Sequence, residues 1–474
     1  MKTPILVWFR RDLRLGDNPA LAEAVNDGHP VLPVYVLDPK AGRKPGAASL
    51  WWLHYSLQRL AEQLQKKGAT FILRRGDTVD VLNALAKEAG VQTIHWNEAA
   101  DASLSAFDSN VRAELTKRGF SVRVFLGSAL LHEPVGNLHT REGKPFRVFT
   151  PFWRAVLDRM PPGLPLPGPV ELVSSAIRPA GERLDDWELL PTKPDWAAGL
   201  RERWEPGESV AVERLSAFLE DQLVSYSDAR DFPARDGNSG LSPHLHFGEV
   251  TPRQVWHRAG NQHSAAFLRE LGWRDFCENL LHHFPAMRTD PLQPGFKRFP
   301  WREDDDALRA WQRGQTGYPL VDAGMRELWH TGYMHNRVRM VVGSFLVKHL
   351  LLHWRHGEAW FWDTLVDADY GNNIANWQWI AGCGADAAPY FRIFNPVLQG
   401  ERFDPAGAYV RRWAPELAEL PDRFIHRPWS ASAIELEAAG IRLGKTYPLP
   451  VVEHDAARKR ALAAFAQIKD SSSG

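Results

Sequence analysis

The segment from Asp367 to Pro396 concentrates side chains that could bind and orient a polar ligand. It begins with two carboxylates, Asp367 and Asp369, and continues with four asparagines and two tryptophans, interrupted by glycines. Buried amides need hydrogen-bond partners, and each Trp brings a large ring with one N–H donor. This composition indicates a pocket for a large, flat aromatic ligand with a polar edge. A Trp-rich helix end packed on a Gly-rich turn explains the same residues equally well.

Metal binding is the other chemistry that paired carboxylates suggest. Asp367 and Asp369 are two residues apart, but no further oxygen-ligand spacing follows them. The two cysteines, Cys277 and Cys383, lack zinc-ligand spacing. We therefore expect no metal site. So few cysteines also favour a reducing compartment over a disulfide scaffold.

A short polar segment precedes Pro243 and consists of Asn238, Ser239, Gly240, Leu241 and Ser242. Ser242 followed by Pro243 predicts the N-cap and the first residue of a helix. The free backbone N–H groups at a helix start bind phosphate. Simple capping is the more ordinary explanation for such a segment on its own.

Two triplets have the i, i+3, i+4 spacing that places side chains on one helix face. They are Glu270, Trp273 and Arg274, and Asn336, Arg339 and Met340. The ordinary explanation for each is a polar contact beside core packing.

The elements that position these residues differ along the chain. Strands are predicted at 5–9, 31–37, 70–75, 93–97 and 122–127, and helices between them at 50–68 and 77–90. This alternation predicts a parallel α/β sheet, although no G-x-G-x-x-G follows the first strand. We expect an α/β domain at 1–130, a Pro-rich connector at 131–205 and a helical domain at 206–474.

Bulk properties set limits on the class of protein. The formal net charge is zero, which counts mildly against nucleic acid as a partner but leaves room for a local basic face. No apolar run approaches the roughly 20 residues of a membrane span. The first apolar run is too short for a signal peptide. We expect a cytoplasmic protein with no membrane partner.

The sequence resembles the DNA photolyase/cryptochrome family, and most of all a class I cyclobutane pyrimidine dimer photolyase. The matching segments occur in the family's order at 5–21, 226–256, 270–285, 310–340, 367–396 and 403–417. The resemblance implies a Rossmann-like N-terminal α/β domain and an all-α C-terminal FAD-binding domain.

The resemblance also implies a set of FAD-contacting residues. They are Tyr226, Asn238, Ser239, Gly240, Leu241, Ser242, Phe267, Glu270, Arg274, Asn336, Arg339, Asp367, Asp369, Asn372 and Asn373. In the family, the residue matching Asp367 pairs with that matching Arg339, and Asn373 matches the residue beside the reactive flavin nitrogen. Asn238 and Phe267 depart from the family, which usually has Thr and sometimes has Trp at these positions. Asn373 is typical of photolyases, whereas plant cryptochromes have Asp there.

A second set faces DNA or takes part in the reaction. Residues implied to bind the lesion or DNA are Arg230, Trp273, Arg337, Met340 and Trp379. Those implied to take part in catalysis or electron transfer are Glu270, Asn336, Trp377, Trp354 and Trp301. Relatives that repair (6-4) photoproducts have two histidines where this chain has Asn336 and Met340.

The implied activity is light-driven repair of cyclobutane pyrimidine dimers by electron transfer from excited, reduced FAD. The expected partner is UV-damaged DNA, bound by a monomer. The alternatives are a cryptochrome-type light sensor, (6-4) repair and general electron transfer. The antenna stays open: Ser103 and Leu104 replace the folate-contacting Asn-Glu pair of some members, so a second chromophore is folate bound differently, another pigment, or absent.

Overall fold

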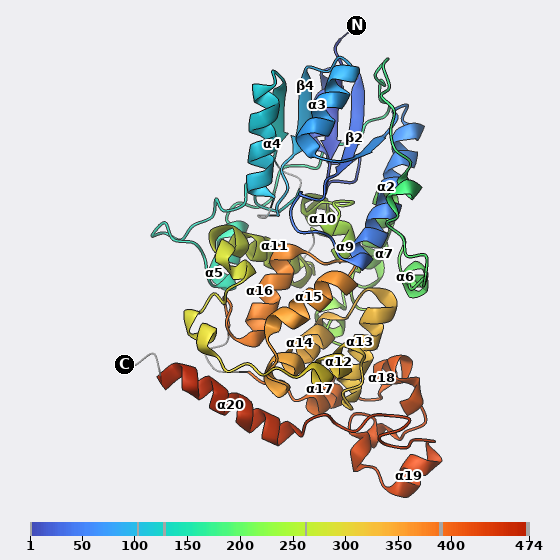
Figure 1. Cartoon of the computed structure of the whole chain (residues 1–474), viewed down its shortest axis with the longest axis vertical. Helices are drawn as coiled ribbons and strands as arrows, with labels where there is room; N and C mark the ends of the chain where they lie inside the picture. Colours follow the sequence, from blue (N-terminus) through green and yellow to red (C-terminus); the bar gives the residue numbers. More distant parts are fainter. Residues whose placement is uncertain (1, 102–103, 127–128, 261–262, 388–391, 471–474) are drawn as a thin grey trace.

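The computed structural model describes residues 2–101, 104–126, 129–260, 263–387 and 392–470. An α/β part with the N-terminus at its tip occupies one end of the molecule, and a helical part fills the other (Figure 1). This arrangement confirms the predicted fold classes. Ser103, one of the two antenna positions, lies outside the described residues.

The α/β part is built on one five-stranded parallel sheet with the strand order β3-β2-β1-β4-β5. The strands are β1 Ile5–Phe9, β2 Val31–Leu37, β3 Ile72–Arg75, β4 Thr93–Asn97 and β5 Ser121–Phe125. The helices are α1 Pro19–Asn26, α2 Ala47–Lys66, α3 Thr78–Glu88 and α4 Ser105–Lys117. α1 and α2 pack on one face, and α3 and α4 on the other. Every residue of β1 is buried, as expected for a central parallel strand covered on both faces.

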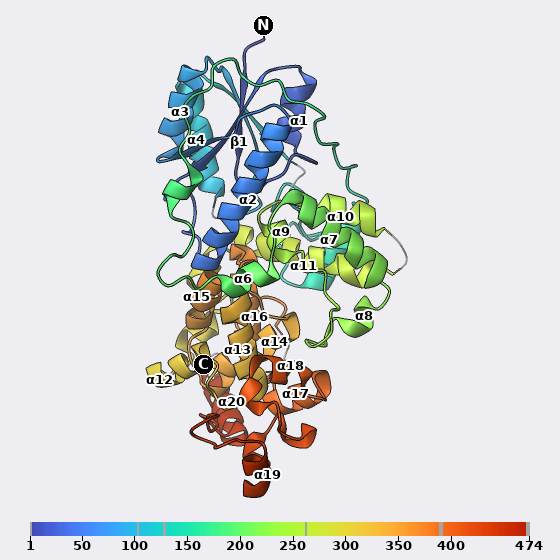
Figure 2. The same cartoon turned by 90° about the vertical axis from the view of Figure 1, so that its right-hand side faces the viewer.

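The segment after β5 is long and mostly irregular, as its prolines predict. It passes up beside the sheet and returns to the helical part (Figure 2). On the way, the Leu172 N–H bonds to the Lys67 carbonyl and the Glu182 N–H to the Leu73 carbonyl. It contains two helices, α5 Phe149–Leu157 and α6 Ala198–Arg203. α5 was not predicted, because a single short helix hardly shows within Pro-rich surroundings. The domain boundaries at 131 and 206 stay predictions.

The helical part surrounds the candidate site. Its helices are α7 Glu208–Asp221, α8 Tyr226–Ala229, α9 Ser242–His246, α10 Pro252–Ala259, α11 Ala265–His283, α12 Asp305–Gln312, α13 Pro319–Thr331, α14 Asn336–Ser344, α15 Trp354–Thr364, α16 Tyr370–Ala381, α17 Pro396–Phe403, α18 Ala408–Trp413, α19 Ala433–Ala438 and α20 His454–Asp470. A π-helical segment, Phe345–His349, continues α14. Within the described ranges, none of these helices has the length and apolar character that a membrane crossing requires.

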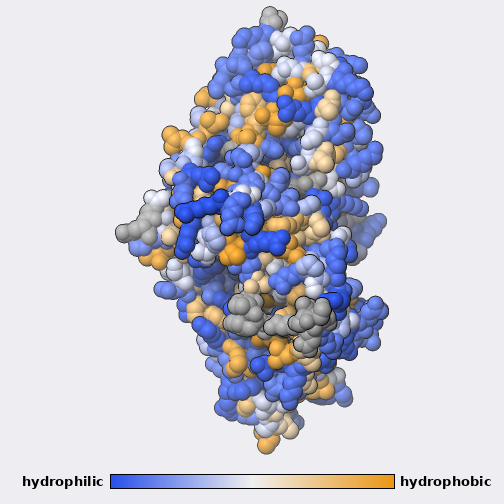
Figure 3. Space-filling model, turned by 90° about the vertical axis from the view of Figure 1, so that its left-hand side faces the viewer, coloured by the Kyte–Doolittle hydropathy of each residue, from blue (hydrophilic) through white to orange (hydrophobic). Residues whose placement is uncertain are grey.

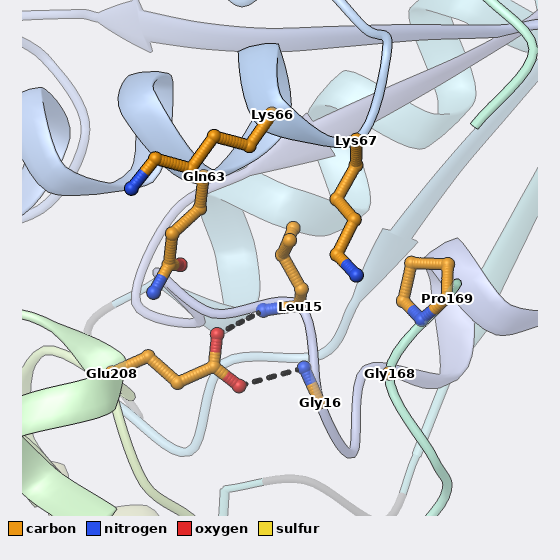
Figure 4. A pocket seen from close by; sticks show the side chains of 8 residues that line it. All are labelled: Leu15, Gly16, Gln63, Lys66, Lys67, Gly168, Pro169 and Glu208. Atoms are coloured by element: carbon orange, nitrogen blue, oxygen red, sulfur yellow. Dashed lines mark hydrogen bonds between the residues drawn. The ribbon is translucent and has the colours of Figure 1, made fainter. Parts of the chain in front are cut away.

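The two parts are joined by buried polar contacts. Glu208, in the first turn of α7, accepts the backbone N–H groups of Leu15 and Gly16, both at 2.8 Å. Figure 4 shows this carboxylate on the wall of a pocket of about 320 Å³, across from Lys67. Trp52 of α2 donates its indole N–H to the buried Glu249 at 3.1 Å. The loop after β1 and helix α2 are therefore held against the helical part.

The C-terminal helix docks through a pair of histidines. His349, in the π-helical segment, lies 2.9 Å from His454 at the start of α20, measured Nε2 to Nδ1. Arg460 of α20 donates to the His349 carbonyl at 2.6 Å. Burial lowers the pKa of His349 to about 3, and the positive charge of His454 and Arg460 acts in the same direction.

His349 should make stability fall in mild acid. The unfolded chain takes up a proton at this residue near pH 6.5 and the folded chain only near pH 3, so the contribution of neutral His349 is complete above pH 6.5 and lost as pH falls. Between pH 7 and 5 the free energy of unfolding should drop by about 2 kcal/mol more in the wild type than in His349→Gln. Urea unfolding followed by Trp fluorescence at the two pH values measures this difference. His356→Gln, at an exposed histidine, should behave as the wild type, and equal pH dependence in all three proteins would contradict the assignment.

Candidate functional site

The predicted site residues meet around the N-terminal half of α16. This helix packs against α11, α14 and α15, and these helices lie together in the middle of the molecule (Figure 1). Ser242 of α9 reaches the same place through its hydroxyl. Tyr226, Leu241 and Phe267 lie instead in a neighbouring apolar cluster with α7 and α10.

One ion pair joins α14 to the segment before α16. Nη2 of Arg339 lies 3.1 and 2.9 Å from the two carboxylate oxygens of Asp367, as the resemblance implied. Arg339 Nε donates to the Met334 carbonyl at 2.7 Å. Burial alone would lower the pKa of Arg339, but the charge of Asp367 outweighs it and raises the pKa. The guanidinium is therefore charged and fixed.

Ser242 does not cap α9 as predicted. It is the first residue of the helix, and the N-cap position is Leu241, whose backbone is already in the αR region. The Ser242 hydroxyl donates instead to Asp367 Oδ2 at 2.6 Å. The capping rule is local, whereas this carboxylate comes from a residue 125 positions away.

Asp369 is the N-cap of α16 and a second fixed anion. It accepts the backbone N–H of Asn372 at 3.0 Å and the Asn372 amide at 2.7 Å, and His246 lies 3.4 Å away. Burial would raise the pKa of Asp369, but His246, Arg274 and the Asn372 N–H hold it well below the usual range. The neighbouring Glu278 has the opposite character, because burial and the charge of Asp369 raise its pKa well above the usual value.

Asn373 is buried and oriented by Glu358 of α15. Its Nδ2 donates to the Glu358 carbonyl at 2.9 Å and to Glu358 Oε1 at 2.8 Å. Both amide hydrogens are thus used, so Oδ1 is the atom left to accept a hydrogen bond. Sequence reasoning did not find Glu358. A lone acid within a Trp-rich helix was its only signal.

Several side chains form the outer side of this region. Arg230 Nη1 lies 2.7 Å from Glu270 Oε1, and its guanidinium is 5.2 Å from the Tyr226 ring centre. Trp273 stacks flat on Phe149, with ring centroids 3.7 Å apart and planes 7° apart. Trp273 and the Glu270 pair are therefore one helical turn apart on α11.

The other predicted DNA-side residues come from α14 and α16. Arg337 pairs with Asp231 at 2.7 Å. Met340 packs half-buried against the largest core cluster, and Asn336 is exposed at the start of α14. Trp379 donates its indole N–H to the Asp386 carbonyl at 3.2 Å.

The loop before α9 runs close over α7. Gly240 has φ +63°, and a Cβ there would lie 2.7 Å from Nη1 of Arg214. Asn238 and Ser239 are half-buried beside it. Arg274 of α11 donates to the Leu245 carbonyl of α9 at 3.4 Å. The loop is therefore a tight backbone turn, in which a residue with a side chain at position 240 would be strained by the positive φ.

Three tryptophans lead from Asn373 to the surface. Trp377 is one helical turn after Asn373 on α16 and rests against Gly357, where a Cβ would lie 2.0 Å from its ring. Trp354 is three residues before Gly357 on α15. Its ring is 5.5 Å from that of His353, which is 5.2 Å from the ring of half-buried Trp301. Trp377 and Trp354 thus belong to one core cluster and Trp301 packs against it, while electron transfer through them stays a prediction.

Comparison with known proteins gives a consistent result. Residues 5–170 match the family model of DNA photolyase, and residues 267–467 match that of the FAD binding domain of DNA photolyase. The chain is 50% identical over 473 residues, 98% of each chain, to a deoxyribodipyrimidine photo-lyase of Agrobacterium fabrum. It is 38% identical to a cryptochrome-2 of Arabidopsis thaliana, covering 99% of this chain and 80% of that one.

A solved structure is similar over the whole fold. The crystal structure of a bacterial class III photolyase from Agrobacterium tumefaciens has a TM-score of 0.96 and 49% sequence identity, covering 99% of this chain and 98% of that chain. The chain therefore belongs to the DNA photolyase/cryptochrome family. That structure is of a class III photolyase, whereas the resemblance suggested class I.

Metal ligation is not part of the observed geometry. Among the residues that the structure describes, no group of three or more His, Cys, Asp and Glu side chains is placed to hold a metal ion. The carboxylates are used by Arg339, Ser242, His246 and Asn372 instead.

Breaking the Arg339–Asp367 pair should cost far more than breaking an exposed pair. Asp367→Ala leaves the Arg339 charge uncompensated where the side chain is 26% exposed, and should lower the free energy of unfolding by about 3 kcal/mol. Asp306→Ala, which removes the partner of Arg309 where Asp306 is 95% exposed, should change it by less than about 0.5 kcal/mol. Urea unfolding compares the two, and similar losses would contradict a structural role for the buried pair.

Proposed function

We propose that this protein repairs cyclobutane pyrimidine dimers in DNA with light, using FAD held in its helical part. The observation that carries the proposal is that α11 and α16 bring two sets of side chains to one place. One set is polar and anchored, from Asp367 to Asn373. The other is a carboxylate and two large rings on the outer side, Glu270, Trp273 and Trp379. Membership of the photolyase/cryptochrome family supports the same conclusion.

The polar set fits FAD. A tight loop with a glycine at φ +63° suits a phosphate chain, and backbone N–H groups at 239–242 are suited to hold it. Arg339 and Asp369 supply charge at the polar edge of a flat ring system, and Asn373 presents its free Oδ1 there. When bound, FAD supplies the light-driven electron transfer, and the protein supplies orientation.

The outer set fits a flipped pyrimidine dimer. Trp273 and Trp379 offer ring faces, and stacking contributes about 1–3 kcal/mol per base. Glu270, now paired with Arg230, is suited to hydrogen-bond a dimer that carries extra negative charge. We place Asn336 and Met340 of α14 beside the path by which the dimer enters the site. Arg337 of the same helix is assigned to the DNA backbone. We assign Trp377, Trp354 and Trp301 to electron supply from the surface.

A hairpin at residues 139–147, closed by the pairing of His139 with Pro145, carries several basic residues. It provides a local path for DNA despite the zero net charge. Arg141, Lys144 and Arg147, together with Phe284, line a groove of about 620 Å³; Glu142 also lines it and pairs with Lys144 at 3.0 Å. The Arg147 carbonyl accepts the Asp386 N–H at 3.1 Å, and Asp386 also holds Trp379. The segment before α5 projects on the left of Figure 1. Figure 3 views the molecule from that left-hand side and shows strongly hydrophilic residues gathered at its middle height. The groove therefore continues from the lesion side of the site.

The setting proposed for this activity is a monomer in the cytosol. Both cysteines are free and buried, which suits a reducing compartment. A sensor role receives less support than repair, because Asn373 and the lesion-side residues match photolyases rather than plant cryptochromes. No antenna pigment is assigned to the α/β part.

Replacing Glu270 should separate repair from cofactor binding. A hydrogen bond to a charged group contributes about 1.5–3 kcal/mol, so Glu270→Ala should slow repair per absorbed photon by about 10- to 100-fold. FAD content should fall far less than repair, because Glu270 pairs with Arg230 on the outer side and is only one of the many residues implied to contact FAD. Flavin absorbance and repair of a dimer-containing oligonucleotide provide the two readouts, with Glu220→Gln on the exposed face of α7 as the control. Unchanged repair in Glu270→Ala would contradict the assigned role.

Removing charge from the hairpin should weaken DNA binding in a salt-dependent way. Each lost phosphate contact reduces the magnitude of the negative slope of log K against log salt by about 0.9. Arg141→Ala and Lys144→Ala should each show this decrease with damaged and undamaged duplex alike. Arg178→Ala, at an exposed arginine of the connector, should leave the slope unchanged. A slope that is the same in all variants would exclude the hairpin from the DNA interface.

A further inference from the structure

The loop between β2 and α2 is clamped onto α15. Trp362 donates its indole N–H to the Lys44 carbonyl at 2.8 Å, and Asp363 accepts the Ala47 N–H at 3.0 Å. Gly46 lies so close that a Cβ there would be 2.1 Å from the Trp362 carbonyl oxygen. The α/β part thus presents this loop to the helical part in a fixed position.

Arg43 extends from this loop toward Glu358 of α15. Its Nη1 and Nη2 each face one carboxylate oxygen, the second at 3.2 Å. The guanidinium also lies 4.3 Å from the ring centre of Trp362 and 5.3 Å from that of Tyr370. Two charge-assisted hydrogen bonds with ring contacts fix both position and charge. The Glu358 side chain is only 9% exposed, so Arg43 is its charge partner in a mostly dry place.

Glu358 in turn dictates which way the Asn373 amide points. The Glu358 carbonyl and an ionised carboxylate can only accept hydrogen bonds, so both must face Nδ2 rather than Oδ1. A flipped amide would place Oδ1 against two acceptors. The anion on Glu358 therefore holds Oδ1 outward, toward the site.

We propose that Arg43 is a positioning residue for the flavin: it fixes the Glu358 carboxylate in place and thereby keeps Asn373 Oδ1 turned toward the ring. The inference rests on the FAD site of the proposed function. An acceptor at the flavin edge stabilises a protonated ring nitrogen, which is the reduced form. Without Arg43, the Glu358 carboxylate loses the two hydrogen bonds that fix its position, and Asn373 Nδ2 keeps only the Glu358 backbone carbonyl as a fixed acceptor. The α/β part thus acts on the redox chemistry of the helical part.

The test measures the midpoint potential for the first electron of FAD in the full-length holoprotein. Arg43→Gln should make it more negative, with about a tenfold loss of the reduced form at fixed potential, equivalent to about 59 mV. Arg43→Lys keeps the charge and should restore part of the shift. Lys44→Gln removes one positive charge from the next residue, which is exposed, and should leave the potential unchanged.

A double-mutant cycle distinguishes a positioning role of Arg43 from a role only in stabilising the contact between the two parts. Glu358→Gln should shift the potential in the same direction as Arg43→Gln, and the double variant should shift it no further, because both act through Asn373. Additive shifts would overturn the proposal. A lower melting temperature in Arg43→Gln with no change in potential would also overturn it, because Arg43 would then only stabilise the contact between the two parts.

Failure of this inference can be told apart from failure of the proposed function. A wild-type protein that binds FAD but does not repair dimers contradicts repair, and the potential still decides the role of Arg43. A wild-type protein that binds no FAD overturns both. Normal repair with an unchanged potential in Arg43→Gln overturns the Arg43 proposal alone.

Discussion

The site depends on the pairing of buried polar groups at the start of α16. Asp367 is held by Arg339 and Ser242, Asp369 by His246, and Asn373 by Glu358. A buried polar group without a partner costs about 1–3 kcal/mol, and more if it is charged. Each pair therefore fixes the distance between two elements, and together they hold α9, α14 and α15 against α16 and the segment before it.

The same requirement joins the two parts of the molecule. Glu208 satisfies backbone N–H groups of the loop after β1, and Arg43 reaches from the loop after β2 to Glu358. The α/β part is consequently a wall of the site as well as a separate sheet. A net charge of zero does not fix how charges are distributed, so it is compatible with a local basic groove for DNA.

Much of the fold could be predicted from the sequence, because strand and helix periodicity is local. β1 to β5, α2 and α3 lie close to the ranges that their apolar patterns predict. α5 was missed within Pro-rich surroundings, and Ser242 was misplaced because its true partner, Asp367, is remote in sequence. The Arg339–Asp367 pair came only through family resemblance. No periodicity could pair Arg43 with Glu358, which are 315 residues apart, and this long-range kind of contact decides the geometry of the site.

The most direct test of the central claim is repair of a thymine-dimer oligonucleotide by the reduced holoprotein, under blue light and in the dark. The account predicts that intact thymines return only in the light, with no net oxidation of the flavin. A protein that binds and reduces FAD yet restores no thymines under blue light would contradict it and move the function to light sensing.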